Sequence, residues 1–340
     1  MKYAPILIPT LCRDKHFIRL VESLKRNTWA KYTDIYIGLD FPPSKKYEEG
    51  YKSICQYLEG DFFEFASFNV IKHSENVGSS ANMESLREIV FKKYDRFIRT
   101  DDDTEFSPNF IEYVDKCLME YEDDSNVIAV TGYSYPIKCE VSDNATIFKE
   151  NFICPMWGTG FWVKKYTKIK NQIENGYLQQ SVDYVFNNNL MDEMLDVSKV
   201  EYVNLCLSPI FKKTLACKMT DIAVRMYTAI NNKYIICPII SKVRNWGFDG
   251  SGEYCSKIDS KNKIDTHSYI FNLQPIDDSS SFTLIPDNLK HVDRNRQKLN
   301  TFETVSWFSL FKIQIKKTLY LLLRKKLFYK LYKLLQLKFK

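Results

Sequence analysis

The sequence predicts an α/β fold in which a mostly parallel central sheet is flanked by helices. Short apolar segments alternate with longer segments whose apolar residues recur at helical spacing. Strands that alternate with helices of roughly 10 to 15 residues form parallel sheets with helices on both faces. The content of 45% hydrophobic and 15% aromatic residues is ample for a packed core and excludes a disordered chain.

The first half of the chain carries the regular part of this pattern. Strands are predicted over residues 3–8, 34–39, 68–71, 97–100 and 127–131. Helices are predicted over residues 15–26, 43–58, 81–92 and 108–122. We expect Asp14 to cap the first helix, and Ser107 with Pro108 to open the fourth.

The second half is less regular. Helices are predicted over 166–174 and 182–195, and from Asp221 to about Asn231, followed by a strand over 235–240. The segment F-I-C-P-M-W-G-T-G-F-W-V at 152–163 predicts a core strand with a bulge at Gly158 or Gly160. Alternatively it is a loop whose bare backbone lets a ligand approach.

Charge and cysteine usage narrow the function classes. The net charge is +6, but no acid follows Glu303 and ten Lys or Arg lie between Lys312 and Lys340. Without those ten, the chain has 38 basic and 42 acidic residues, so the part before residue 312 is slightly acidic. This charge balance argues against a nucleic-acid-binding domain. The nine cysteines are scattered without a C-x-x-C, which indicates free thiols in a reducing compartment. We expect neither a signal peptide nor a membrane-spanning segment.

Three consecutive aspartates, Asp101 to Asp103, follow the strand at 97–100. Adjacent carboxylates repel one another, and a hard divalent cation such as Mg²⁺ or Mn²⁺ is the expected counter-charge. The alternative is a solvated acidic turn that favours the N-terminus of the following helix.

Polar side chains also follow the first two predicted strands. Thr10 and Arg13 come after the first, and Asp40 comes after the second. The carboxyl ends of parallel strands share one edge of a sheet, where ligands bind. A basic group, an isolated acid and an acidic cluster on one edge suit a nucleotide with a metal-bound diphosphate.

The triplet and its surroundings resemble a known family. The triplet is similar to the D-x-D element of GT-A glycosyltransferases. The segment D-D-D-T-E-F-S-P-N-F-I-E-Y resembles the E-D-D-…-P-D-F-…-Y segment of N-acetylglucosaminyltransferase I. Family 2 glycosyltransferases of bacterial surface-polysaccharide clusters are also similar. The resemblance covers roughly residues 3–255.

The resemblance implies roles at the donor site. Asp103 would be the direct ligand of Mn²⁺ or Mg²⁺, and the remaining residues would bind the donor: Thr10, Arg13, Asp40 (facing uracil), Asn82, Asp101 and Asp102. Each of three has an ordinary alternative. Arg13 would be a surface arginine, Asp40 a turn residue, and Asn82 an exposed helix residue.

The resemblance also extends to the acceptor side. Trp157, Gly158 and Gly160 would line the sugar and acceptor pocket. Asp221, at a helix start before an x-P-x-x-S strand and a Gly-rich loop, would be the catalytic base; the alternative is a helix-capping aspartate, and Asp183 is the second candidate base. The chain departs from its bacterial relatives after the loop, where G-T-H is replaced by Gly252-Glu253-Tyr254. His267 is the candidate substitute, although its interpretation as a lone surface histidine is favoured.

Together these patterns predict a metal-dependent, inverting glycosyltransferase that moves a sugar from a nucleotide-sugar, most simply UDP-linked, to a glycan hydroxyl in bacterial surface polysaccharide synthesis. Residues 1–135 would bind the nucleotide-sugar, 136–271 the acceptor, and 272–303 would form a linker. One rival is a sugar-phosphate nucleotidyltransferase, although Pro9–Arg13 lacks the glycine-rich loop that such enzymes need. The other is a non-catalytic glycan- or membrane-binding protein.

The last predicted segment is a basic hydrophobic helical tail over 304–340. Its apolar residues fall nearly all round a helix, so no single amphipathic stripe is visible. One interpretation packs it on the catalytic domain. The preferred one lays it on an anionic membrane, which would place the protein in the cytoplasm at the inner face of the cytoplasmic membrane.

Overall fold

The computed structural model describes residues 3–138, 140–151, 154–208, 214–251, 272–289, 298–299 and 305–338. The chain forms two compact units. The first comprises Met1–Lys149, Pro155–Lys165 and Ile235–Leu289, and the second comprises Glu150–Cys154, Tyr166–Tyr234 and Lys290–Lys340. These bounds differ from the predicted ones at 135 and 271, because a late stretch of the chain returns to the first unit.

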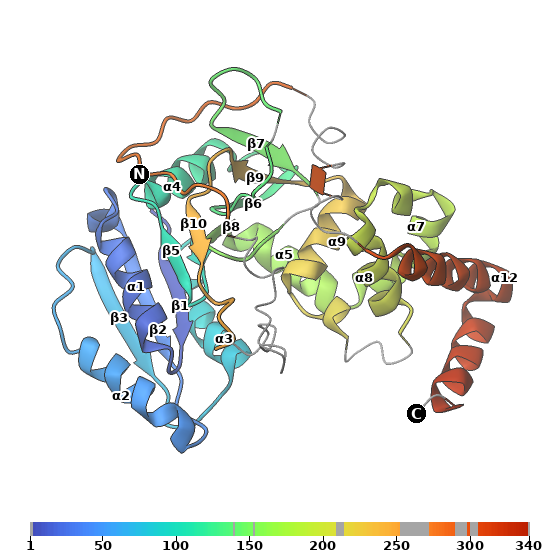
Figure 1. Ribbon diagram of the computed structural model, residues 1–340, viewed down its shortest axis with the longest axis horizontal. Coiled ribbons are helices and arrows are strands. Elements are labelled where there is room, and N and C mark those ends of the chain that lie inside the picture. The colour runs from blue at the N-terminus through green and yellow to red at the C-terminus, as the bar shows by residue number, and fades with distance from the viewer. Residues whose placement is uncertain are drawn as a thin grey trace. The chain divides into compact units, whose positions relative to one another are not determined.

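An eight-stranded sheet is the centre of the first unit (Figure 1). Its order is β3-β2-β1-β4-β8-β6-β9-β7. The strands are β1 (Ile6–Thr10), β2 (Asp34–Leu39), β3 (Ser67–Lys72), β4 (Arg96–Arg99), β6 (Val127–Thr131), β7 (Ile147–Glu150), β8 (Thr159–Trp162) and β9 (Tyr234–Pro238). Strands β3, β2, β1 and β4 are parallel, whereas β8 runs antiparallel to both β4 and β6. The predicted α/β class, with helices flanking a large central sheet, is confirmed.

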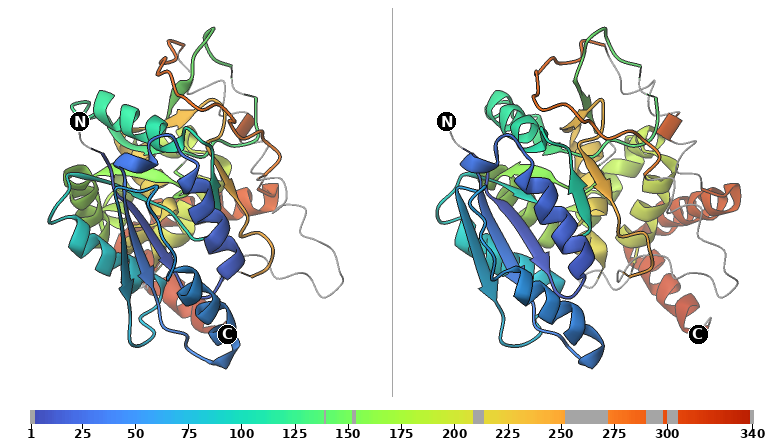
Figure 2. Two further views of the ribbon diagram at one scale, coloured as in Figure 1. Left: turned by 90° about the vertical axis from the view of Figure 1, so that its left-hand side faces the viewer. Right: turned by 60° about the vertical axis from the view of Figure 1, so that its left-hand side comes forward.

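Four helices connect the strands of the first unit: α1 (Asp14–Lys25), α2 (Glu48–Tyr57), α3 (Ser79–Val90) and α4 (Phe110–Glu120). Single 3-10 turns lie at Ala30–Tyr32 and Lys45–Tyr47. Helix α1 buries Phe17, Leu20, Val21 and Leu24, the face expected from its spacing. Right-handed crossovers place α1 and α2 on one face of the sheet and α3 on the other (Figures 1 and 2).

The order of the strands creates a switch point beside β1. The chain moves outward from β1 through β2 to β3, and then returns to β4 on the opposite side of β1. Connections on the two sides of such a point diverge and leave a crevice at the carboxyl ends of the strands. The segments after β1 and β4, with Arg13 and the triplet, therefore face each other there.

Several predicted helix starts are corrected. Helix α4 begins at Phe110 with Asn109 as its N-cap residue, and not at Ser107-Pro108. Residues Thr104–Phe106 instead form β5, which pairs antiparallel with β10 (Val243–Asn245). Because Thr104–Phe106 is extended in β5, α4 begins only after the turn that follows this strand. Arg13, not Asp14, occupies the N-cap position of α1.

The second unit is helical. It contains most of α5 (Val163–Glu174), followed by α6 (Tyr177–Gln180), α7 (Val182–Asn187), α8 (Asp196–Cys206), α9 (Asp221–Asn231) and α12 (Trp307–Lys338), with 3-10 turns at Leu190–Glu193 and Leu215–Cys217. The helix predicted over 182–195 is interrupted, because Asn189 adopts a left-handed conformation with φ of 54°. The tail forms one long helix that packs against α8. Within the part of the chain described, no helix is both long and apolar enough to cross a bilayer.

A buried carboxyl group ties the N-terminal segment to α4. Asp115 is fully buried, and its Oδ1 accepts a hydrogen bond of 2.9 Å from the backbone N–H of Ala4. Its Oδ2 has no hydrogen-bond partner among the described residues. Burial raises the pKa of Asp115 to about 7, against the opposing influence of the Ala4 N–H and the Arg96 charge.

We expect Asp115→Asn to flatten part of the pH dependence of stability. The folded chain keeps the Asp115 proton up to pH about 7, whereas the unfolded chain releases it near pH ~4. Stability should therefore fall as pH rises through this interval, by about 1.4 kcal/mol per unit from this group. Urea unfolding of both proteins across the interval measures it, and parallel curves for the two would contradict the assignment.

Candidate functional site

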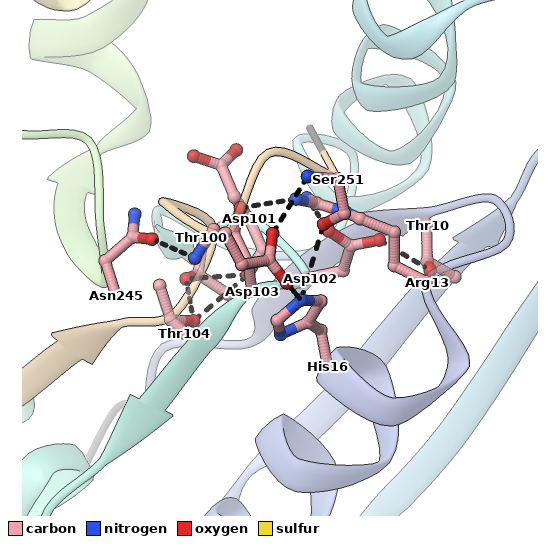
Figure 3. Close-up of polar contacts among 12 residues, drawn as sticks. Thr10, Arg13, His16, Thr100, Asp101, Asp102, Asp103, Thr104, Asn245 and Ser251 are labelled. Atoms are coloured by element: carbon pink, nitrogen blue, oxygen red, sulfur yellow. Dashed lines mark hydrogen bonds and ion pairs between the residues drawn. The ribbon is translucent and has the colours of Figure 1, made fainter. Parts of the chain in front are cut away.

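A single arginine bridges two carboxylates across the switch point (Figure 3). Arg13, in the turn between β1 and α1, contacts Asp102 through Nη2 and lies 2.8 Å from Asp103 Oδ2 through Nη1. The Thr10 hydroxyl, at the end of β1, donates to the other oxygen of Asp102 at 2.9 Å. The segment after β1 is thus fastened to the turn after β4.

The electrostatics of this cluster follow from burial. Asp102 and Asp103 are both buried, and burial raises the pKa of each, to about 7 for Asp103, where the nearby Asp101 adds to the effect. Arg13 opposes the rise at both. Burial lowers the pKa of Arg13, but the two carboxylates outweigh that and raise it overall. Arg13 is therefore a permanent cation held between two carboxyl groups.

Asp101 is held differently. Its Oδ1 accepts a hydrogen bond of 2.5 Å from Arg99 Nη2, and Arg99 also donates to the carbonyl of Met156 at 3.2 Å. The hydroxyl of Thr104 donates to the carbonyl of Asp101 at 3.0 Å and lies 2.8 Å from the hydroxyl of Thr100. These bonds shape the turn, and they leave the Asp101 carboxylate the most exposed of the three.

A loop over residues 246–251 lies against the triplet. Strand β10 pairs with β5, and the backbone N–H of Trp246 then donates to the carbonyl of Asp103 at 2.7 Å. A Cβ on Gly247 would lie 2.0 Å from Asp103 Oδ2, so only glycine allows this approach. His16 of α1 holds the far side of the loop, with its Nε2 2.9 Å from Asp249 Oδ2 (Figure 3).

Asp40 is buried and its carboxylate binds the chain itself. Its oxygens accept hydrogen bonds of 2.9 Å from the backbone N–H groups of Phe41, Val77 and Gly78, and of 3.2 Å from the Asn76 side chain. Asp40 thereby holds the 76–78 loop beside the end of β2. This role is larger than that of a turn residue, and the predicted contact with uracil stays a prediction.

Asn82 is also buried, so its interpretation as an exposed helix residue is wrong. Its amide donates to the carbonyl of Gly38 at 2.8 Å, and its Oδ1 lies 3.2 Å from His73 Nε2. It therefore joins α3 to the ends of β2 and β3. Donor binding by Asn82 stays a prediction, and the side chain already has partners in the protein.

The aromatic segment contributes one side chain to an open position. Trp157 is half-buried and packs edge-to-face on Tyr133 and Phe248, with ring centroids at 4.9 and 5.8 Å. Gly158 (φ of 60°) and Gly160 face inward instead. A Cβ at Gly158 would meet the rings of Phe106 and Phe110, and one at Gly160 would meet the Val114 and Leu118 side chains. Close packing against α4 and β5 therefore accounts for these two glycines, and their role in a sugar pocket stays a prediction.

The candidate bases belong to the second unit. Asp221 is the first residue of α9 and is exposed, whereas the Thr220 side chain caps the helix by accepting from the Ala223 N–H at 3.2 Å. The interpretation of Asp221 as the cap is therefore wrong, and its role as base stays a prediction. Asp183 accepts a hydrogen bond of 2.7 Å from the Tyr320 hydroxyl of α12. Residues 252–254 and His267 lie outside the described residues.

The triplet can accept a divalent cation only with help from other ligands. Among the described residues, no three His, Cys, Asp or Glu side chains are grouped to hold one metal ion. However, Asp103 Oδ1 is buried and has no hydrogen-bond partner there. One or two carboxylates completed by substrate phosphates and water form a common Mg²⁺ site. The residues present therefore fit a cation that arrives with a phosphorylated ligand.

Three parts of this site do not follow from the sequence pattern: Arg99, the strand β5 and the contact of His16 with Asp249. Arg99 lies two residues before Asp101, within the predicted strand, and the strand pattern does not indicate its contact with that carboxylate. The short T-E-F of β5 forms a strand only through its pairing with β10, about 140 residues later. No local pattern reports that pairing.

No family model matches the chain, and no curated protein matches it in sequence. Solved structures that are similar include S. aureus TarS, with 12% identity over 43% of this chain and a TM-score of 0.30. The 1–349 fragment of TarS with UDP-GlcNAc has 13% identity over 51% of this chain and a TM-score of 0.35. The Pyrobaculum calidifontis mannosyltransferase PcManGT with GDP-Man and Mn²⁺ has 10% identity over 51% and a TM-score of 0.38. The chain spans 24%, 48% and 53% of these chains, respectively.

We expect Arg13→Gln to destabilise the first unit, because it leaves Asp102 and Asp103 buried without their cation. The loss should be about 3 to 5 kcal/mol, as for a broken buried ion pair. Added Mn²⁺ should raise the melting temperature of this variant more than that of the wild type, since it replaces part of the missing charge. Thermal unfolding with and without Mn²⁺ measures both effects.

Arg87→Gln is the matched control. The Arg87 side chain is 13% exposed, compared with 20% for Arg13. Its ion pair is with the exposed carboxylate of Glu84, at 2.9 Å on the same helix. Its removal should cost less than about 1 kcal/mol, with no response to Mn²⁺. Equal losses of stability in the Arg13 and Arg87 variants would show that the ion pairs of Arg13 with Asp102 and Asp103 contribute no more than an exposed ion pair.

Proposed function

We propose that this chain is a metal-dependent glycosyltransferase that transfers a sugar from a nucleotide-sugar, most simply a UDP-sugar, to a glycan hydroxyl. The observation that carries the proposal is the buried Asp103 Oδ1 at the switch point of the sheet, which has no hydrogen-bond partner among the described residues. Nucleotides bind at such points, at the carboxyl ends of the strands. The likeness of the aspartate triplet to the D-x-D element supports the same assignment.

The three aspartates have different roles at the site of the nucleotide-sugar donor. Asp103 offers one oxygen to Arg13 and has one left to act as a metal ligand. A divalent cation bound there would neutralise negative charge on the departing diphosphate as a Lewis acid. Asp101 is the most exposed of the three carboxylates and is the one available to a ribose hydroxyl. Both carboxylate oxygens of Asp102 already accept hydrogen bonds, one from the Thr10 hydroxyl and one from Arg13, so Asp102 positions these two side chains.

The acceptor side rests on Trp157 and Asp221. Trp157 packs on two rings and is partly exposed, which suits an apolar sugar face. Phe248 links this aromatic group to the 246–251 loop against Asp103. Asp221 would remove the proton from the attacking hydroxyl, so that the sugar is transferred with inversion. The resemblance favours bacterial surface polysaccharide as the product.

Asp103→Asn should abolish Mn²⁺-dependent binding of UDP, because a neutral amide is a poor ligand for a hard cation. Calorimetric titration of UDP with and without Mn²⁺ measures the effect. The control is Asp192→Asn, an exposed aspartate of the second unit, which should bind as the wild type does. Unchanged affinity in the Asp103 variant would refute the metal assignment.

Asp221→Asn tests the catalytic base. Thr220 caps α9, so the substitution leaves the cap intact and the fold should not change. If Asp221 is the base, turnover should fall by ~10²–10⁴-fold while UDP binding persists. The assay is release of UDP from a panel of nucleotide-sugars with Mn²⁺ and a sugar acceptor. Full activity in the variant would show that Asp221 is not the base, and Asp183 would be tested next. No UDP release from any donor by the wild type would favour a binding protein.

A further inference from the structure

The first half of helix α12 carries one apolar face that is covered and one that is exposed. The covered face, which includes the buried Ile313 and Tyr320, packs against α7 and α8. Tyr320 donates to Asp183 at 2.7 Å and packs edge-to-face on Phe186 at 5.4 Å. Lys316 donates to Asn204 of α8 at 2.7 Å. This face is a specific packing surface within the second unit.

The opposite face is an exposed apolar stripe. At 100° per residue its six members fall within an arc of about 120°, centred almost opposite Ile313 and Tyr320. Their exposed fractions range from 42% at Leu319 to 76% at Trp307. The members of this stripe are Trp307, Phe308, Phe311, Ile315, Leu319 and Leu322. They all lie within the first half of α12, whose place in the fold Figure 1 shows.

Basic residues accompany the stripe. Lys312 is exposed at its edge, with Nζ 4.3 Å from the centre of the Phe308 ring. Ten Lys or Arg and no acid occur between residues 304 and 340. A second copy of the chain would bring the same charges against these, which opposes self-association through this face. An anionic surface would instead be attracted by the exposed basic residues of α12, such as Lys312 and Lys330.

We propose that the α12 stripe binds the surface of an anionic lipid bilayer, with the helix lying in the plane of the interface. Tryptophan, phenylalanine and leucine side chains would enter the headgroup region, and the lysines would face the anionic headgroups. The helix remains packed on α8 while it binds, because the two faces are opposite. This surface is independent of the chemistry assigned to the aspartate triplet.

The experiment is co-sedimentation of the full chain with vesicles of phosphatidylcholine alone, or with about 30% phosphatidylglycerol. The wild type should bind the anionic vesicles, and binding should weaken as salt screens the charges. The triple variant Trp307→Ser/Phe311→Ser/Leu322→Ser should bind at least about tenfold more weakly and keep the wild-type melting temperature, since these residues are exposed. Lys312→Glu/Lys330→Glu should weaken the salt-dependent part of the binding, because two of the ten positive charges are reversed.

A matched control removes equally exposed apolar side chains of the first unit, as Phe63→Ser/Ile240→Ser/Leu273→Ser. It should bind vesicles as the wild type does. Size-exclusion chromatography without lipid tests the other occupant. A wild-type dimer that the stripe variant dissociates would assign the stripe to a second copy and overturn the proposal. Wild-type protein that ignores anionic vesicles, or a stripe variant that binds them fully, would overturn it as well.

Discussion

The first unit depends on how it accommodates negative charge at the carboxyl ends of its strands. Three adjacent carboxylates at the end of a buried strand repel one another and lose hydration. Arg13 offsets this by contacting two of them at once. Because Arg13 follows β1 and the aspartates follow β4, the same ion pairs fix the geometry of the switch point. A residue that would elsewhere be a surface arginine thus becomes the centre of the site.

The same constraint explains why three identical residues have different properties. Each aspartate differs in what surrounds it and not in its chemistry. Both oxygens of Asp102 are bound by Thr10 and Arg13, and Asp101 is paired with Arg99 near solvent. Asp103 keeps one buried oxygen that has no partner in the described part of the chain. The 246–251 loop enforces this asymmetry, since the absence of a side chain at Gly247 brings the backbone against Asp103. A cation would meet a single well-defined oxygen and not a diffuse acidic surface.

The sequence predicted well those features that depend on local pattern. The strands at 34–39 and 127–131 and the helix from Asp221 match the structure, because their apolar spacing alone defines them. The positions of Arg13 and the triplet also followed from strand order. The features it missed depend on distant partners. The four hydrogen bonds of Asp40 come mostly from the 76–78 loop, and Asn82 is buried by β2 and His73.

The spacing of apolar residues in the tail does not identify its exposed face, although the helix is regular. A helix with one covered face gives one apolar stripe, and its polar face identifies the side exposed to solvent. Helix α12 has two stripes on opposite sides, so their contributions to the pattern cancel and the apolar residues seem to lie all round. Burial separates them: Ile313 and Tyr320 belong to the packed side, and Trp307 and Phe311 to the open one. Of the two interpretations of the tail from sequence, the packed helix is confirmed by the contacts with α8, and the interfacial helix stays a prediction. A packed helix holds its opposite face in a fixed orientation. An aromatic stripe presented in this way loses less conformational entropy when it meets a partner than the same stripe on a free segment.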